Sequence, residues 1–163
     1  MIREREPADD EAIHRLNDAA FGGSYESRLV DELRSAGLAV IELVSIDGSG
    51  VIGHILLSTL DVTVAGEPLR ALALAPMSVH PDRQRQGIGS GLVHMALERA
   101  RQQDWQAVIV VGHPGYYPRF SFSAALAHPL ASPFSGEAFM ALELMPDALK
   151  GGAGLIVYPS AFG

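Results

Sequence analysis

One segment of this chain is more informative about its fold than any other: Met77-Ser-Val-His-Pro-Asp-Arg-Gln-Arg-Gln-Gly-Ile-Gly-Ser-Gly91. An apolar, β-branched run ends at Val79, and a polar loop follows it. Three glycines at positions 87, 89 and 91 then open the segment Ile88–Gln102, whose apolar residues recur at helical spacing. The segment therefore predicts a strand, a loop and an amphipathic helix in immediate succession.

The glycines at the start of this helix indicate an anion site. The first N–H groups of a helix have no partner within it, and residues without a Cβ let a ligand approach them closely. Arg83 and Arg85 add positive charge to the loop in an otherwise acidic chain. The segment thus favours a phosphorylated ligand.

Other interpretations of the glycines fit less well. A nucleotide-binding P-loop needs Gly-Lys-Ser/Thr at the helix start, and no Lys is present there. A dinucleotide fold needs its glycines directly after the strand, whereas here a loop intervenes. A turn without a ligand rarely needs three glycines, since each costs about 1 kcal/mol relative to Ala inside a helix.

The rest of the chain predicts helices first and then an antiparallel meander. The expected helices are Asp9–Phe21 and a second from about Ser24 to Gly37, before the helix at Ile88–Gln102. The expected strands are residues 2–6, Leu38–Ile46, Val51–Val64, Leu69–Val79, Ala107–Val111, Phe139–Leu144 and Gly154–Tyr158. A loop-rich stretch is expected from His113 to Gly136, and no repeat or linker is visible.

Composition excludes several classes of protein. The 163 residues are 48% hydrophobic and 19% charged, enough to bury one core, and no apolar run is long enough to span a bilayer. No secretory signal is visible and no cysteine is present, so we expect a cytoplasmic protein without disulfides or thiolate catalysis. The net charge of −7, without a basic cluster, argues against nucleic acid, and no His pair has the spacing of a zinc site.

The pattern Val79-x-Pro81-x-x-Gln84-x-x-Gly87-x-Gly89 resembles motif A of the GNAT acetyltransferase superfamily. The order of the expected elements over residues 1–122 is similar to that of the superfamily. The later segments Tyr116–Phe122 and Phe139–Leu144 resemble its bacterial YhbS-like branch. The resemblance implies an α/β fold of the α+β type, as a single domain over residues 1–163. Its sheet would be mixed, mostly antiparallel and twisted, with helices on both faces and a splay between strands four and five.

The resemblance also implies acetyl-CoA as cosubstrate. The pantetheine arm would pair with the backbone at Met77 and Val79, where Pro76 marks an edge or a bulge, and an N–H near Met77 or Ser78 would polarise the acetyl carbonyl. The backbone positions implied for the pyrophosphate are Gln84, Arg85, Gln86, Gly87, Ile88, Gly89 and Ser90.

Tyr117 is the implied proton donor to the leaving thiolate. Family members commonly place a Tyr four residues before a Gly-Phe pair, and here Ser121-Phe122 stands at that pair, so Tyr116 is the alternative after a shift of one residue. The general base is left open: Glu26, Glu42, Asp61 and Glu67 are each expected to be surface charges, and a water chain or a base-free route would serve equally. His54 and His94 are expected to be structural or on the surface.

The implied activity is N-acetylation of a primary amine, on a small molecule or a peptide, by direct attack in a ternary complex without a metal. The alternative is a non-catalytic module that binds or senses acyl-CoA. Residues 1–47 contain five basic and eleven acidic residues, which favour either a cationic amine or a solvated helix face. No nucleic-acid or membrane partner is expected, and the resemblance leaves a homodimer as one option for assembly.

Overall fold

The computed structural model describes residues 1–163, whose contacts divide into two compact units. The first unit comprises Met1–Ser58 and Ala75–Glu98, and the second comprises Thr59–Leu74 and Arg99–Gly163. Two long strands and one helix each contribute residues to both units. The expectation of a single domain over residues 1–163 stays a prediction.

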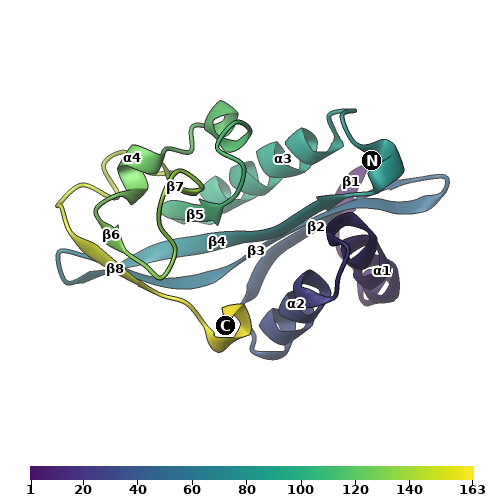
Figure 1. The fold of residues 1–163 in the computed structure, drawn as a ribbon, viewed down its shortest axis with the longest axis horizontal. Helices are drawn as coiled ribbons and strands as arrows, with labels where there is room; N and C mark the ends of the chain where they lie inside the picture. The colour runs from purple at the N-terminus through teal and green to yellow at the C-terminus, as the bar shows by residue number, and fades with distance from the viewer. The chain divides into compact units, whose positions relative to one another are not determined.

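The elements follow one another as the sequence predicts, with two short additions (Figure 1). The helices are α1 (Asp10–Phe21), α2 (Tyr25–Ser35), α3 (Ile88–Gln102) and α4 (Ala124–Ala127). The strands are β1 (Ile2–Glu4), β2 (Ala39–Asp47), β3 (Gly50–Val64), β4 (Glu67–Val79), β5 (Ala107–Val111), β6 (Leu130–Ala131), β7 (Phe139–Glu143) and β8 (Gly154–Val157).

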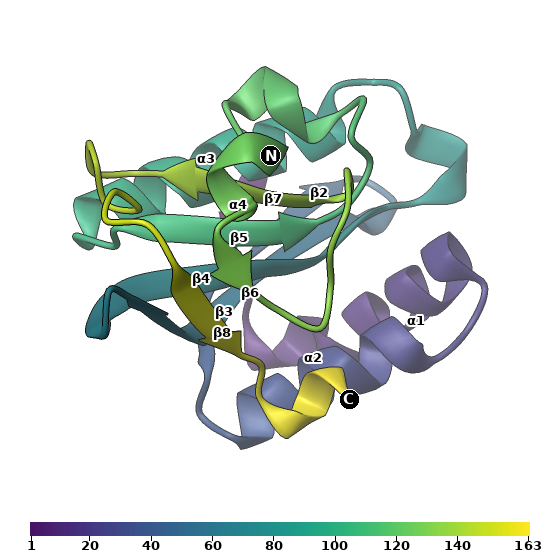
Figure 2. The same cartoon turned by 60° about the vertical axis from the view of Figure 1, so that its left-hand side comes forward.

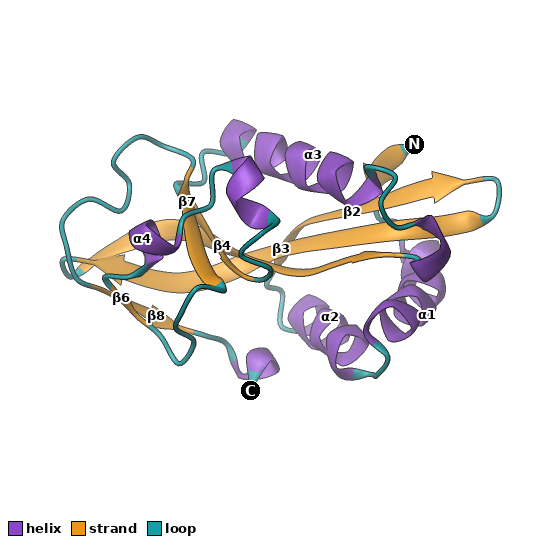
Figure 3. Cartoon of the chain, turned by 45° about the horizontal axis from the view of Figure 1, so that its top comes forward, coloured by secondary structure: helices purple, strands orange, loops and turns teal.

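In the first unit, β1, β2 and β3 form an antiparallel sheet with helices on both faces (Figure 3). Successive side chains of a strand point to opposite faces, and two neighbours in β3 show which helix covers which face. A Cβ on Gly53 would meet Leu92 and Ile88 of α3, whereas the next residue, His54, lies beside Asn17 of α1. The expected helices on both faces are therefore confirmed here.

Helices α1 and α2 form where apolar residues recur at helical spacing. Ile13 and Leu16 of α1 and Leu33 of α2 are at most 3% exposed, because they bury the face that turns away from water. Gly22 ends α1 in the left-handed conformation, with φ of 73°, directly after Phe21, where the expected helix ends.

In the second unit, the remainder of β3 and β4 joins β5 and β7 in that order (Figure 2). β5 is parallel to β4 and antiparallel to β7, and four of its five residues are buried. β8 pairs antiparallel with β3 and parallel with β6. The core of this unit gathers apolar side chains from all of these strands and from α4.

The sheet is mixed and mostly antiparallel, which confirms the expected fold class. The pairing of β4 with β5 covers only Ala71–Leu74, and Pro76, which has no N–H to donate, follows directly in β4. The loop-rich stretch from His113 to Gly136 contains two elements that the sequence did not predict, α4 and β6, which have only four and two residues. No helix combines the length and apolar character needed to cross a bilayer.

Substitution of Gly53 tests the approach of α3 to the sheet. A Cβ at this position would lie 2.9 Å from Cδ1 of Leu92 and 3.0 Å from Cγ2 of Ile88, closer than carbon atoms pack. We expect Gly53→Val to lower the free energy of unfolding by about 1–3 kcal/mol, measured by urea denaturation. Gly23→Val is the control, because a Cβ there meets nothing within 4 Å. Equal stability of the two variants would contradict this packing.

Candidate functional site

The loop between β4 and α3 presents a row of backbone N–H groups. Arg85 and Gly87 have φ of 64° and 82°, so left-handed residues alternate with ordinary ones just before α3. Such alternation turns successive N–H groups toward one side, which is the geometry of an anion-binding nest. The helical bond from the Gly91 N–H runs to the Gly87 carbonyl at 3.0 Å, so the N–H groups of Ile88 and Gly89 have no carbonyl within the helix.

The end of β4 turns its backbone groups alternately toward and away from β3. The N–H of His80 donates to the Ile52 carbonyl of β3 at 2.8 Å. Because N–H and C=O directions alternate along a strand, those of Val79 and Met77 point away from β3, and those of Ser78 point toward it. Of the two predicted oxyanion donors, Met77 therefore has the N–H that β3 does not use.

All the residues predicted to hold the cofactor lie in the first unit, within β4, the loop and the first turn of α3. Gln84 donates from Nε2 to the Val79 carbonyl at 3.3 Å, which folds the loop back onto the strand end. The side chains of Arg85 and Gln86 are exposed. Ser78 is 3% exposed and its Oγ has no hydrogen-bond partner.

Tyr117 lies in the second unit, at the start of a 3-10 helix spanning Tyr117–Phe120. Its ring packs edge-on against Tyr116 and Phe122, with ring centroids 5.2 and 5.6 Å away. A Cβ on Gly112 would overlap this ring, so a glycine is needed there. Burial raises the pKa of the Tyr117 phenol well above its ordinary value of 10, with the neighbouring Tyr116 adding to the shift. The phenol is therefore protonated at neutral pH.

Ser121 adopts the backbone conformation that a glycine would supply at this position. Its φ is 76°, in the left-handed region that costs a residue with a Cβ about 1–2 kcal/mol. The departure from Gly-Phe to Ser121-Phe122 therefore changes the residue type and keeps the turn. Phe122 remains buried, at 2% exposure.

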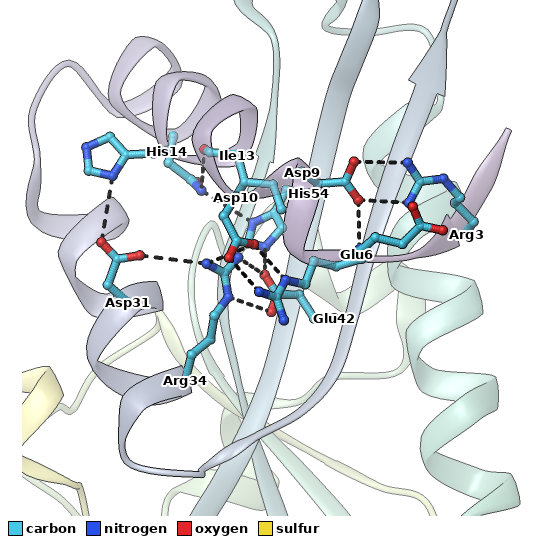
Figure 4. Close-up of polar contacts among 12 residues, drawn as sticks. Arg3, Glu6, Asp9, Asp10, Ile13, His14, Asp31, Arg34, Glu42 and His54 are labelled. Atoms are coloured by element: carbon cyan, nitrogen blue, oxygen red, sulfur yellow. Dashed lines mark hydrogen bonds and ion pairs between the residues drawn. The ribbon is translucent and has the colours of Figure 1, made fainter.

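A buried polar network connects α1 and α2 to the sheet of the first unit (Figure 4). Glu42 of β2 accepts hydrogen bonds from Arg34 of α2 at 3.0 and 2.5 Å, and lies 2.7 Å from Nε2 of His54. The side chains of Glu42 and His54 are 8% and 0% exposed. Asp10 of α1 contacts the same Arg34 at 3.3 Å and also accepts from Arg5.

Hydrogen bonding assigns the tautomer of His54. The amide nitrogen of Asn17 donates to the Ile13 carbonyl at 3.2 Å and lies 3.3 Å from Nδ1 of His54. Since a carbonyl can only accept, this nitrogen is correctly placed, and Nδ1 must accept from it. The proton of a neutral His54 then sits on Nε2 and points at Glu42.

This network corrects the expectation that Glu42 is a surface charge. Burial alone would raise the pKa of Glu42, but the hydrogen bonds from His54 and Arg34 outweigh it and lower that pKa from 4.5 to about 2. A carboxylate held in this way is a poor base for an ammonium group. Asp61 and Glu67 are exposed, as expected, and Glu26 is half-buried. No sequence signal reveals the network, because its partners lie 8 and 12 residues from Glu42.

Acid titration tests the state of Glu42. Because its pKa is lowered in the folded protein, its stabilising contribution is present above about pH 4.5 and is lost as the pH falls toward 2. A shift of this size corresponds to roughly 3 kcal/mol. We therefore expect Glu42→Gln to unfold at lower urea concentration than wild type at pH 7, with the difference shrinking as the pH falls below 4.5.

Glu11→Gln is the matched control for this titration. Glu11 pairs with Arg15 at 2.9 Å, but its side chain is 87% exposed. Its loss should change stability by less than about 1 kcal/mol at any pH, because exposed ion pairs contribute little. A difference between Glu42→Gln and wild type that stays constant from pH 7 to pH 2 would contradict the role given to Glu42.

Comparison with known proteins places this geometry in a family. Residues 1–125 match the model of an acetyltransferase (GNAT) domain. The uncharacterized N-acetyltransferase YhbS of Escherichia coli strain K12 is 34% identical over 99% of this chain and 98% of its own length. YjhQ, another uncharacterized N-acetyltransferase of that strain, is 38% identical over 74% of this chain and 67% of its own length.

Solved structures agree with this comparison. The crystal structure of Escherichia coli YhbS in complex with CoA matches with a TM-score of 0.89 and 34% identity, over 99% of this chain and 91% of that one. A GNAT family acetyltransferase from Brucella melitensis in complex with acetyl-CoA matches with a TM-score of 0.82 and 31% identity, over 100% and 97% of the two chains. The chain therefore belongs to the GNAT acetyltransferase family.

Proposed function

We propose that the chain is an acetyl-CoA-dependent N-acetyltransferase that transfers the acetyl group to a primary amine within a ternary complex. The observation that carries the proposal is the nest at Arg85 and Gly87, which lies between the end of β4 and the start of α3. Two relatives at 34% and 31% identity were crystallised with CoA and acetyl-CoA.

The nest suits the pyrophosphate of acetyl-CoA. Backbone N–H groups from Gln84 to Ser90 would donate to its oxygens, and the partial positive charge of the α3 N-terminus would favour its negative charge. No side-chain cation is required for this, although exposed Arg85 adds positive charge to the loop. The family's cofactor thus fits the residues present.

The end of β4 suits the arm that carries the thioester. Strand alternation directs the N–H and C=O groups of Met77 and the N–H of Val79 away from β3, so an extended amide-containing chain could pair with them as an added strand. The Val79 carbonyl already accepts from Gln84 at 3.3 Å and would have to share its oxygen with that chain. The Met77 N–H would then stabilise negative charge on the acetyl carbonyl oxygen. Ser78, the alternative donor, suits this role less well, because strand alternation directs its N–H toward β3.

The reaction would exchange one bond for another on the acetyl carbon. The amine nitrogen attacks this carbon, a C–N bond forms, the C–S bond breaks, and the amine loses a proton while the thiolate of CoA gains one. Tyr117 is proposed as the donor to the thiolate. Its raised pKa keeps it protonated, so it acts by hydrogen bonding to the developing negative charge more than by complete proton transfer.

Calorimetric titration with acetyl-CoA tests the cofactor site. We expect wild type to bind acetyl-CoA with micromolar affinity, and NAD and dephospho-CoA, the controls, to bind more weakly. Gly87→Val should lower the affinity at least about tenfold, because a β-branched residue does not tolerate the φ of 82° that the nest requires. Gly23→Val should bind as wild type does. Absence of binding to wild type would mean that the loop is a turn without a ligand.

Steady-state turnover with a panel of amines tests the catalytic role. We expect Tyr117→Phe to lower kcat at least about tenfold, because it removes the donor and keeps the ring. Its affinity for acetyl-CoA should stay close to that of wild type. If Tyr117→Phe keeps full activity while Tyr116→Phe loses it, the donor to the thiolate is Tyr116 and not Tyr117. Binding of acetyl-CoA by wild type without acetylation of any amine would indicate a module that binds acyl-CoA without catalysis.

A further inference from the structure

An exposed ion pair joins the cofactor loop to a turn that lies far from it in sequence. Arg83, in the loop, donates from Nη1 to the carboxylate of Asp47, the last residue of β2 before the turn into β3. Its Nη2 lies 3.3 Å from Oγ of Ser49 in the same turn. Both segments belong to the first unit, and we call these three residues the clamp.

The turn holds its carboxylate ready for this contact. Oδ1 of Asp47 accepts from the Ser49 N–H at 2.7 Å and from its hydroxyl at 2.6 Å, which leaves Oδ2 for Arg83. The hydrogen bonds from Ser49 and the contact with Arg83 lower the pKa of Asp47 to about 2. Asp47 is therefore ionised at neutral pH with a fixed orientation.

The other contacts of the loop secure mainly its first half. The N–H of Arg83 donates to the His80 carbonyl at 2.8 Å, and the N–H of Asp82 donates to Nδ1 of His80 at 3.1 Å. Beyond Arg83, the side chain of Gln84 makes one long hydrogen bond, to Val79. The clamp is thus the last strong anchor before the nest.

The nest itself needs an anchor because its backbone is strained. Arg85 has a Cβ and a φ of 64°, a conformation that costs about 1–2 kcal/mol and persists only where the surroundings impose it. Arg85 follows Arg83 by two residues. Because only Gln84 separates the two residues, holding Arg83 in place would restrict the backbone conformations open to Arg85.

We propose that the clamp positions the loop for acetyl-CoA, so that Asp47 and Arg83 set the affinity for the cofactor without contacting it. The inference rests on the proposed function, because it concerns the cofactor loop. It assigns a role to Asp47, whose negative charge lies beside a site for a polyanion. The negative charge of Asp47 by itself would weaken the binding of acetyl-CoA by repulsion, whereas its hold on Arg83 would strengthen binding by positioning the loop.

The two explanations predict opposite effects on the affinity for acetyl-CoA when the charge of Asp47 is removed. Asp47→Asn removes a negative charge and also breaks the ion pair. If Arg83 acts only through its charge, Asp47→Asn should bind acetyl-CoA as tightly as wild type or more tightly. If the clamp positions the loop, Asp47→Asn and Arg83→Gln should each weaken binding, by about 1.4- to fivefold, the range expected for one exposed ion pair. Calorimetric titration at constant ionic strength measures both.

Two further variants complete the test. The double variant Asp47→Asn/Arg83→Gln should be no weaker than either single variant, because both remove the same interaction. Ser49→Ala removes the hydroxyl that orients Asp47 and contacts Arg83 without changing any charge, so it should also weaken binding. Binding by the double variant that is clearly weaker than by either single variant would overturn the proposal.

A matched control separates the clamp from general electrostatics. Asp82 lies next to Arg83 and its side chain is 88% exposed, so Asp82→Asn makes the same change in charge without breaking the clamp. It should bind acetyl-CoA no more weakly than wild type. In turnover assays the clamp variants should raise the KM for acetyl-CoA far more than they change kcat, and their thermal midpoints should match wild type. Failure of wild type to bind acetyl-CoA would instead overturn the proposed function.

Discussion

The close approach of α3 to β3 at Gly53 is the contact on which the geometry of the first unit depends. Because Gly53 has no side chain, Ile88 and Leu92 can lie directly against the strand. Ile88 is the first residue of α3, so this contact fixes where the helix begins and where its unpaired N–H groups lie. The strained nest before Ile88 is held between this contact and the ion pair of Arg83 with the turn before β3.

The polar groups on the two faces of this sheet differ in whether they are paired within the chain. On the side of α3, the chain leaves backbone donors without partners, which favours a negatively charged ligand. On the side of α1 and α2, it pairs its own charges, and Glu42 is enclosed by Arg34 and His54. Six of the eleven acids in residues 1–47 contact an arginine: Asp9, Asp10, Glu11, Asp31, Glu42 and Asp47. Fewer of these acids are therefore available to attract a cationic amine.

The sequence predicted the elements that are long and regular. Periodicity placed α3 at Ile88–Gln102 and β5 at Ala107–Val111, which are the observed bounds, because both elements have an uninterrupted apolar pattern and glycine or polar flanks. It missed α4 and β6, because four and two residues contain too little of a period to be recognised. The positions proposed for the cofactor were implied by the resemblance of Val79–Gly89 to motif A, and they stay a prediction. The pairing of Glu42 and the clamp at Asp47 did not follow from the sequence, because both depend on contacts between segments that are distant in sequence.

The enclosure of Glu42 has a consequence for how this sequence can change over evolutionary time. Removing one partner of a buried charge costs about 3–5 kcal/mol, whereas replacing all of them by apolar residues of similar volume can be nearly neutral. Arg34 keeps Asp10 and Asp31 as partners if Glu42 is lost, whereas Glu42 loses its arginine if Arg34 is lost. A lineage that changes Arg34 first therefore passes through an intermediate with a poorly matched carboxylate beneath α1 and α2. With a total stability of about 5–15 kcal/mol for an ordinary domain, that intermediate has little margin. The network therefore constrains the order of substitution, because a change at Glu42 leaves Arg34 with acidic partners and a change at Arg34 does not leave Glu42 with an arginine.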